Sequence, residues 1–143
     1  MKRSILGHIV LILFLSAACS PDENVMPKPE LSVSNEFMTN WNGCLKGSAL
    51  GIDPNLYYVS IYVRVEDLWE SLPDKSTSVI PISIDNEWIC TPVSLKVEQI
   101  SEIMIFLLPN RFNSPVLDGE KSIPLKITLV SVASHRMSFK ESI

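Results

Sequence analysis

The sequence has few of the residues from which catalytic and cofactor-binding motifs are built. Its 143 residues include 5 glycines, 2 histidines and 3 cysteines. The glycines are too dispersed to form the loops that hold nucleotide phosphates or the sharp turn that presents a nucleophilic serine. His8 lies in an apolar N-terminal run, which leaves His135 as the one histidine of the remaining chain that could act as a base. We therefore expect no cofactor and no catalytic triad.

Clustered positive charge is also lacking. The chain has 12 Lys and Arg residues against 16 Asp and Glu residues, which gives a net charge of −4. A protein that binds a polyanion gathers its basic residues on one face, whereas here they are scattered among acidic residues. Nucleic acid is therefore not expected as a partner.

No apolar run reaches the roughly 20 residues that a membrane-spanning helix requires. The longest run, from Ile5 to Ala18, follows the basic pair Lys2 and Arg3. This combination of a basic start and a short apolar stretch is typical of a secretory signal peptide. We expect residues 1–18 to form a short signal helix that is removed from the mature chain.

The small residues Ser16, Ala17 and Ala18 lead directly into Cys19. This stretch resembles the lipobox of bacterial lipoproteins, although Leu15 lies one place earlier than the leucine of the usual pattern. The resemblance implies that Cys19 becomes the N-terminus and carries acyl chains such as palmitate. Each buried CH₂ of such chains contributes about 0.8 kcal/mol to membrane binding. The membrane is therefore the first expected partner, and the cell envelope the expected location.

Asp22 and Glu23 follow the cysteine closely. This pair resembles the acidic export signal of Bacteroidetes-type lipoproteins that are carried to the outer face of the outer membrane. Two acids in a polar linker also occur by chance, so both the periplasmic and the surface-exposed face of the outer membrane stay open. Residues 19–36 are polar and bear prolines, and we expect a flexible linker there. Residues 37–143 then form a single domain.

The clearest periodicity in the domain runs from Tyr57 to Val65, where apolar residues alternate with polar and aromatic ones. This pattern predicts a central strand with one face on the core and one wetter face. Asp67 to Leu72 is expected to be a short helical turn that Pro73 ends. A loop rich in turn residues is expected over 110–119. Further strands are expected at 78–84 (an edge strand, because of Pro81), around Trp88 and Cys90, and at 93–97, 103–108 and 123–132. Residues 31–33 and 135–139 are candidate strands.

A helix over 97–108 is the alternative to the strand at 103–108, but β-branched residues and Pro109 favour the strand. Six or seven short strands without a long helix predict an all-β fold. The expected architecture is an antiparallel β-sandwich of immunoglobulin-like type.

Cys44 and Cys90 form an even pair in a chain that is expected to leave the cytosol, which makes them a disulfide candidate. Closing their 46-residue separation would stabilise the fold by about 4 kcal/mol in the chain-entropy model. Two buried free thiols are the alternative. With His135 they could supply at most three metal ligands, without the close spacing that zinc sites use, so no metal is expected.

Tyr58 and Tyr62 share the wetter face of the central strand, and we expect them to form an outward aromatic patch that binds a protein or glycan partner. Trp41 and Trp88 are instead expected in the core.

These features favour a non-enzymatic binding or assembly module. The first alternative is an inhibitor or immunity-type lipoprotein of the envelope that presents the 110–119 loop to the active site of a hydrolase or toxin. The second is a glycan-active enzyme, which needs two carboxylates about 5 to 10 Å apart. Its candidate pairs are Glu66 with Asp67 and Glu98 with Glu102.

Overall fold

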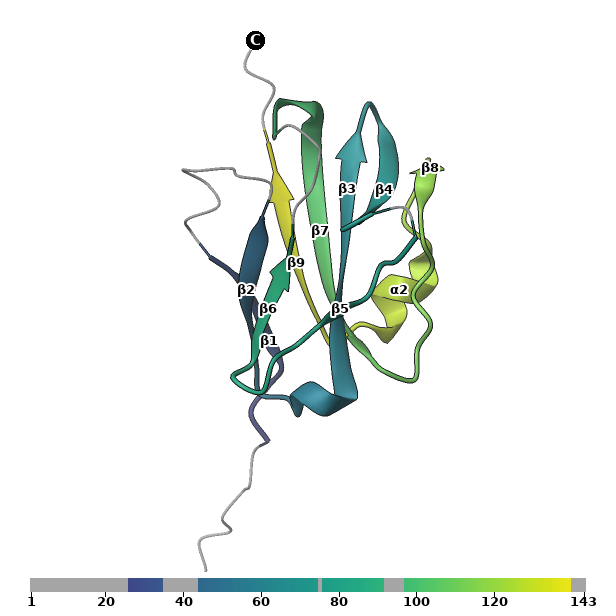
Figure 1. The fold of residues 1–143 in the computed structure, drawn as a ribbon. Helices are drawn as coiled ribbons and strands as arrows, with labels where there is room; N and C mark the ends of the chain where they lie inside the picture. Colours follow the sequence, from purple (N-terminus) through teal and green to yellow (C-terminus); the bar gives the residue numbers. More distant parts are fainter. Residues whose placement is uncertain (1–25, 35–43, 75, 92–96, 140–143) are drawn as a thin grey trace, which may run out of the picture.

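The computed structural model describes residues 26–34, 44–74, 76–91 and 97–139, and the chain is mostly β (Figure 1). The signal segment 1–18, Cys19 and Trp41 lie outside the described residues, as does most of the expected strand at 93–97. The strands are β1 (Glu30–Val33), β2 (Leu45–Leu50), β3 (Tyr57–Val65), β4 (Leu68–Leu72), β5 (Ile80–Pro81), β6 (Glu87–Cys90), β7 (Ile100–Pro109), β8 (Asp118–Glu120) and β9 (Ala133–Ser138). The helical elements are the 3₁₀ turns η1 (Pro54–Leu56) and η2 (Val97–Gln99) and the α-helix α2 (Leu125–Val130).

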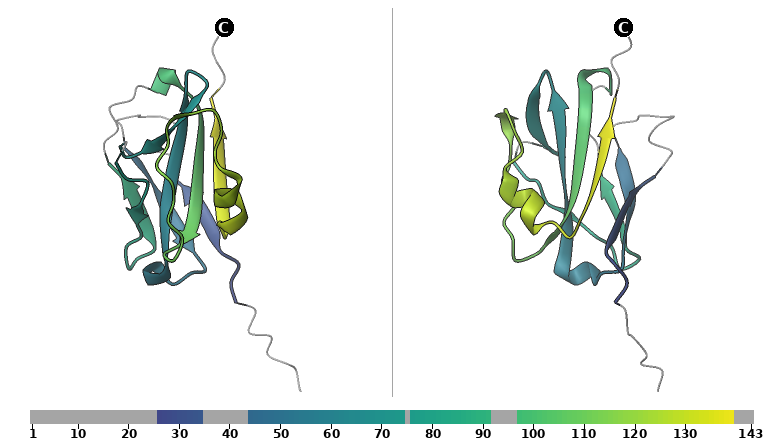
Figure 2. Two further views of the ribbon diagram at one scale, coloured as in Figure 1. Left: turned by 90° about the vertical axis from the view of Figure 1, so that its right-hand side faces the viewer. Right: turned by 180° about the vertical axis from the view of Figure 1, so that it is seen from behind.

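The strands form two antiparallel sheets, as the sequence predicted in outline. The small sheet has the order β1-β2-β6, and the large sheet has the order β8-β4-β3-β7-β9, with β5 paired to the first half of β3. Figure 2 shows three layers, in which the small sheet lies on one side of the large sheet and α2 on the other. Within the described residues, no helix is long and apolar enough to span a membrane.

The main core lies between the two sheets. The strand β3 contributes Val59, Ile61 and Val63, which are the alternate apolar residues of the predicted pattern. Trp88 and Cys90 reach this core from β6 on a shared face, as expected. At one side of the core, β5 continues into a single bridge between Ile82 and Trp88, which links the two sheets.

A second core covers the opposite face of the large sheet. Its buried members come from strands β3, β4 and β7, from the 110–117 segment and from α2, and they are Tyr58, Tyr62, Trp69, Phe106, Leu108, Leu117 and Ile127. The prediction that one face of β3 is wetter is therefore wrong, because the 110–117 segment and α2 exclude water from that face. β3 is a central strand that is buried on both faces.

Ser114 is the centre of the hydrogen bonds that fix the 110–117 segment to the large sheet. Its backbone N–H donates to the hydroxyl of Tyr58 over 3.1 Å, and its side chain lies 2.5 Å from the hydroxyl of Tyr62. The two tyrosines donate in turn to the carbonyl oxygens of Phe112, over 2.8 Å, and Pro115, over 2.9 Å. Each buried hydroxyl thus has partners, which removes the cost of placing it in a core.

Three segments differ from their sequence-based predictions. The expected helical turn at 67–72 is the strand β4, because Glu66 and Asp67 both have positive φ angles (49° and 66°) and close a two-residue hairpin between β3 and β4. The expected strand at 123–132 contains the helix α2 instead. Its alternation of apolar residues is not used, since Ile127 is buried while Leu125 and Leu129 are exposed.

The third difference concerns the domain boundary. The strand β1 pairs along its length with β2, from Glu30 opposite Leu50 to Val33 opposite Gly47. Leu31 is buried in the main core. The folded domain therefore includes the end of the expected 19–36 linker and does not begin at residue 37. The strand at 103–108 is confirmed over the alternative helix, as part of β7.

We predict that Tyr62→Phe destabilises the fold by about 1–3 kcal/mol, because it leaves Ser114 and the carbonyl of Pro115 with fewer partners in a buried place.

The same change should also alter the pH dependence of stability. Burial raises the pKa of Tyr62 above its ordinary value of 10.0. As the pH rises above 10, the unfolded chain therefore loses this proton first, and the free energy of unfolding of the wild type falls. Urea unfolding at a series of pH values should show a shallower alkaline fall for Tyr62→Phe. Tyr57→Phe, at the half-buried start of the same strand, is the matched control, and equal effects of the two changes would contradict the prediction.

Candidate functional site

The structure does not place the predicted tyrosine patch on the surface. Tyr58 and Tyr62 do share a face, but their exposed fractions are 4% and 0%. Their rings belong to the second core, and Tyr62 packs edge-on against Phe106 with the ring centres 6.0 Å apart. The prediction of an outward binding surface at these two residues is therefore wrong, because the 110–117 segment covers them.

No disulfide joins Cys44 and Cys90 in the structure, so the predicted bridge is absent. The residue opposite Cys90 in the strand register is Leu45, and Cys44 precedes it by one place, outside the paired part of β2. An even cysteine count shows only that a bridge is possible in number, and the strand register does not pair the two cysteines with each other. Burial, with a smaller contribution from the nearby Cys44, raises the pKa of the Cys90 thiol to about 12, which keeps this sulfur protonated and unreactive.

The carboxylates named for glycan chemistry do not meet in one hollow. Glu66 and Asp67 form the exposed β3–β4 turn, and Glu98 is exposed in η2. Glu102 is buried and paired with Arg64 and Arg136. Among the residues that the structure describes, no group of three or more His, Cys, Asp and Glu side chains could hold a metal ion.

The 110–119 loop, which an inhibitor would present to an enzyme, lies flat against the large sheet. Ser114 and Leu117 are buried in it. The backbone of Leu117 exchanges two hydrogen bonds with Ser71 of β4, at 2.9 Å to the main chain and 2.7 Å to the side chain. The middle of this loop therefore does not protrude.

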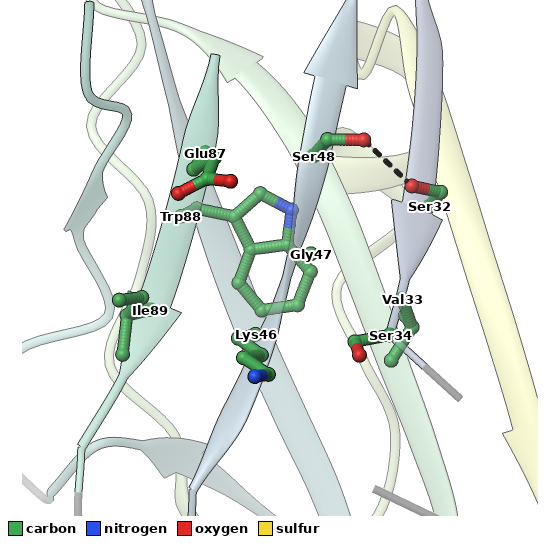
Figure 3. Close-up of a pocket in the computed structure, with 9 residues that line it drawn as sticks. All are labelled: Ser32, Val33, Ser34, Lys46, Gly47, Ser48, Glu87, Trp88 and Ile89. Carbon is green, nitrogen blue, oxygen red and sulfur yellow. Dashed lines mark hydrogen bonds between the residues drawn. The ribbon is translucent and has the colours of Figure 1, made fainter. Parts of the chain in front are cut away.

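A hollow of about 410 Å³ lies along the small sheet, and we call it the small-sheet groove (Figure 3). Its chemistry is mixed, with three serine hydroxyls, one ammonium, one carboxylate and an exposed isoleucine. The lining residues come from all three strands and are Ser32, Val33, Ser34, Lys46, Gly47, Ser48, Glu87, Trp88 and Ile89. Ser32 and Ser48 hydrogen-bond across β1 and β2 at 2.8 Å, which fixes the two hydroxyls at one end of the hollow.

Gly47 lines this groove at a place where no side chain fits. A Cβ at Gly47 would overlap the carbonyl oxygen of Ser32 and lie 2.6 Å from Cζ2 of Trp88. In Figure 3 the indole of Trp88 extends from β6 to Gly47 on β2. A glycine is therefore required where β1 and the indole approach β2. The indole N–H of Trp88 is buried and has no acceptor among the described residues.

A second hollow, of about 320 Å³, lies on the opposite face of the large sheet, and we call it the large-sheet pocket. Cationic and apolar side chains surround it, and its lining residues are Arg64, Trp69, Glu102, Met104, Phe106, Lys121, Ser122, Ile123, Thr128 and Arg136. Oε1 of Glu102 is 2.5 Å from Nε of Arg136, and its Oε2 is 3.8 Å from a terminal nitrogen of Arg64. The sequence analysis did not find this site, because its charged residues are far apart in the chain and meet through strand register.

Comparison with models of protein families, with curated proteins and with solved structures gives no match. The interpretation of the two hollows therefore depends on their own residues.

We predict that Gly47→Ala destabilises the fold by about 1–3 kcal/mol, because the new methyl group must displace the Trp88 indole or the backbone of β1. The measurement is the free energy of unfolding in urea, together with Trp88 fluorescence in the folded state. Ser48→Ala, the next residue on the same strand, is the control and should cost less than about 1 kcal/mol. An unchanged stability in Gly47→Ala would show that the indole does not lie against β2.

Proposed function

We propose that the chain is a lipid-anchored lipoprotein of the cell envelope that carries a non-enzymatic binding or assembly module. In this proposal the small-sheet groove is the partner surface, and the immunoglobulin-like sandwich is the scaffold that displays it. The observation that carries the proposal is the groove itself. It is a hollow of about 410 Å³ on a sheet that has no helix packed over it in the described chain.

The residues of the groove suit an extended polar ligand. Serine hydroxyls both donate and accept hydrogen bonds. Ser32 lies on β1, Ser34 directly after it and Ser48 on the neighbouring strand β2, and all three line the groove. Lys46 and Glu87 add opposite charges, while the side chain of Ile89 offers an exposed apolar contact. A peptide segment or a glycan of an envelope partner has this alternation of polar and apolar groups. The N–H of Trp88, which also lines the groove, is buried and has no acceptor in the described chain.

The N-terminal sequence supports the anchor. The apolar run and the small residues before Cys19 have the order of a lipoprotein signal. From Cys19 to the first residue of β1, Glu30, the chain has 11 residues, which extend to at most roughly 35 Å at about 3.3 Å per residue. A module on so short a tether binds partners that are close to the membrane surface.

We expect Cys19→Ala to abolish acyl labelling and to release the protein from the membrane fraction, because the lipid is the only membrane attachment in the proposal. The measurement is metabolic labelling with a palmitate analogue, followed by fractionation of the cells. Cys44→Ala is the matched control and should keep both the label and the membrane association. Equal labelling of wild type and Cys19→Ala would contradict the anchor.

The groove is tested with a photo-crosslinking amino acid placed at Ile89 in living cells. We expect a discrete adduct with an envelope component, and we expect Ser48→Arg to remove it, because the long charged side chain fills the groove. Leu129 is the matched control position, since it is also an exposed aliphatic side chain but belongs to α2. The same adduct from Leu129, or an adduct from Ile89 that Ser48→Arg leaves unchanged, would contradict the assignment.

A further inference from the structure

The large-sheet pocket concentrates positive charge in an acidic protein. Arg64, Lys121 and Arg136 contribute three cations to its lining, against the single carboxylate of Glu102. The whole chain has a net charge of −4, so this local excess is opposite in sign to the rest of the molecule. The cations come from three elements, since Arg64 is on β3, Arg136 is on β9 and Lys121 follows β8.

Glu102 orients the two arginines without using all their donors. It lies between them on β7, opposite Arg64 in the strand register, and its side chain is only 10% exposed. Arg136 contacts it through Nε, which leaves the terminal nitrogens of that guanidinium for other acceptors. Arg64 also binds Asp67 over 3.1 Å, and its own Nε is buried without a partner in the described part of the chain.

Lys121 is not needed to balance this arrangement. The exposed ammonium belongs to the segment between β8 and α2, and no described carboxylate pairs with it. Two hydroxyls, of Ser122 and Thr128, line the pocket beside it. Ammonium, guanidinium and hydroxyl groups that converge on one hollow are the donors that recognise carboxylate or phosphate oxygens.

The floor of the pocket is apolar. Trp69 and Phe106 are buried members of the second core, and Met104 and Ile123 pack against them at its edge. A hollow of about 320 Å³ has room for one aromatic ring with its substituent. An aromatic body would contact Trp69 and Met104 while its anionic group faces the cations.

From this geometry we propose that the large-sheet pocket binds a small organic anion, in which a phosphate or carboxylate group is attached to an aromatic or similarly flat apolar body. Arg64, Lys121 and Arg136 hold the anionic group, and Trp69, Met104 and Phe106 hold the body. The pocket lies on the face of the large sheet that is turned away from the small sheet. It shares no lining residue with the small-sheet groove.

The proposal is tested on the protein without its signal segment by NMR titration with phenyl phosphate and, separately, with benzoate. We expect at least one of the two to shift the indole N–H of Trp69 and the methyl group of Met104 saturably. The comparison between them shows whether the pocket prefers phosphate or carboxylate. Inorganic phosphate and benzyl alcohol, which carry only one half of the recognised chemistry each, should bind roughly tenfold more weakly or not at all.

Lys121→Gln is the decisive variant, because its side chain is exposed and its loss does not disturb the cores. We expect it to raise the Kd of the better probe roughly tenfold. Lys126→Gln, an exposed lysine of α2 outside the lining, is the matched control and should leave the Kd unchanged. The proposal is overturned if neither probe shifts the pocket resonances, if benzyl alcohol or inorganic phosphate binds as tightly, or if the two lysine variants behave alike.

Discussion

Burial of both faces of β3 is the constraint on which the rest of the structure depends. The strand is nine residues long, and it pairs with β4 and β5 on one side and with β7 on the other. Val59, Ile61 and Val63 require an apolar cover, which the small sheet supplies. Tyr58 and Tyr62 on the other face require a cover that also accepts and donates hydrogen bonds, and the 110–117 segment supplies it. The layer on each side of the large sheet thus matches the chemistry of the face of β3 that it covers.

The hydrogen bonds at Ser114 explain why the sequence predicted the strand but not its environment. The alternation from Tyr57 to Val65 is a local pattern, and it correctly indicated β3 and its place in the middle of a sheet. Whether the tyrosine face is wet depends on Ser114, which is more than 50 residues away in sequence. No local pattern shows that a serine from a distant loop will satisfy a buried tyrosine.

The other differences have the same origin in long-range contacts. The apolar positions from Ile123 to Leu129 suit a strand. The free side of β7 is already paired with β9, however, up to Leu107 opposite Ala133, so this segment has no place beside β7. The segment folds as α2 over the second core, where only Ile127 is buried. Cysteine count suggested a disulfide, while strand register places Leu45 opposite Cys90. The candidate hollows were equally hidden from sequence, because each combines residues from at least three separate elements.

The double cover of β3 also determines where a ligand has access. The 110–117 segment and α2 occupy most of one face of the large sheet and leave the large-sheet pocket beside the β3–β4 hairpin. On the other side, the small sheet shields the main core and carries the groove, whose lining includes Gly47. Both hollows are therefore consequences of the way in which this chain covers its central strand.

Amide hydrogen exchange, measured by NMR on the folded domain, tests the double cover most directly. The N–H groups of Ser114 and Leu117 donate to buried hydroxyls of the large sheet, those of Tyr58 and Ser71. If the 110–117 segment is an integral layer, these two amides exchange as slowly as those in the middle of β3, at the rate set by global unfolding. Fast exchange at Ser114 and Leu117, with slow exchange in β3, would show that the segment opens by itself and would contradict the account.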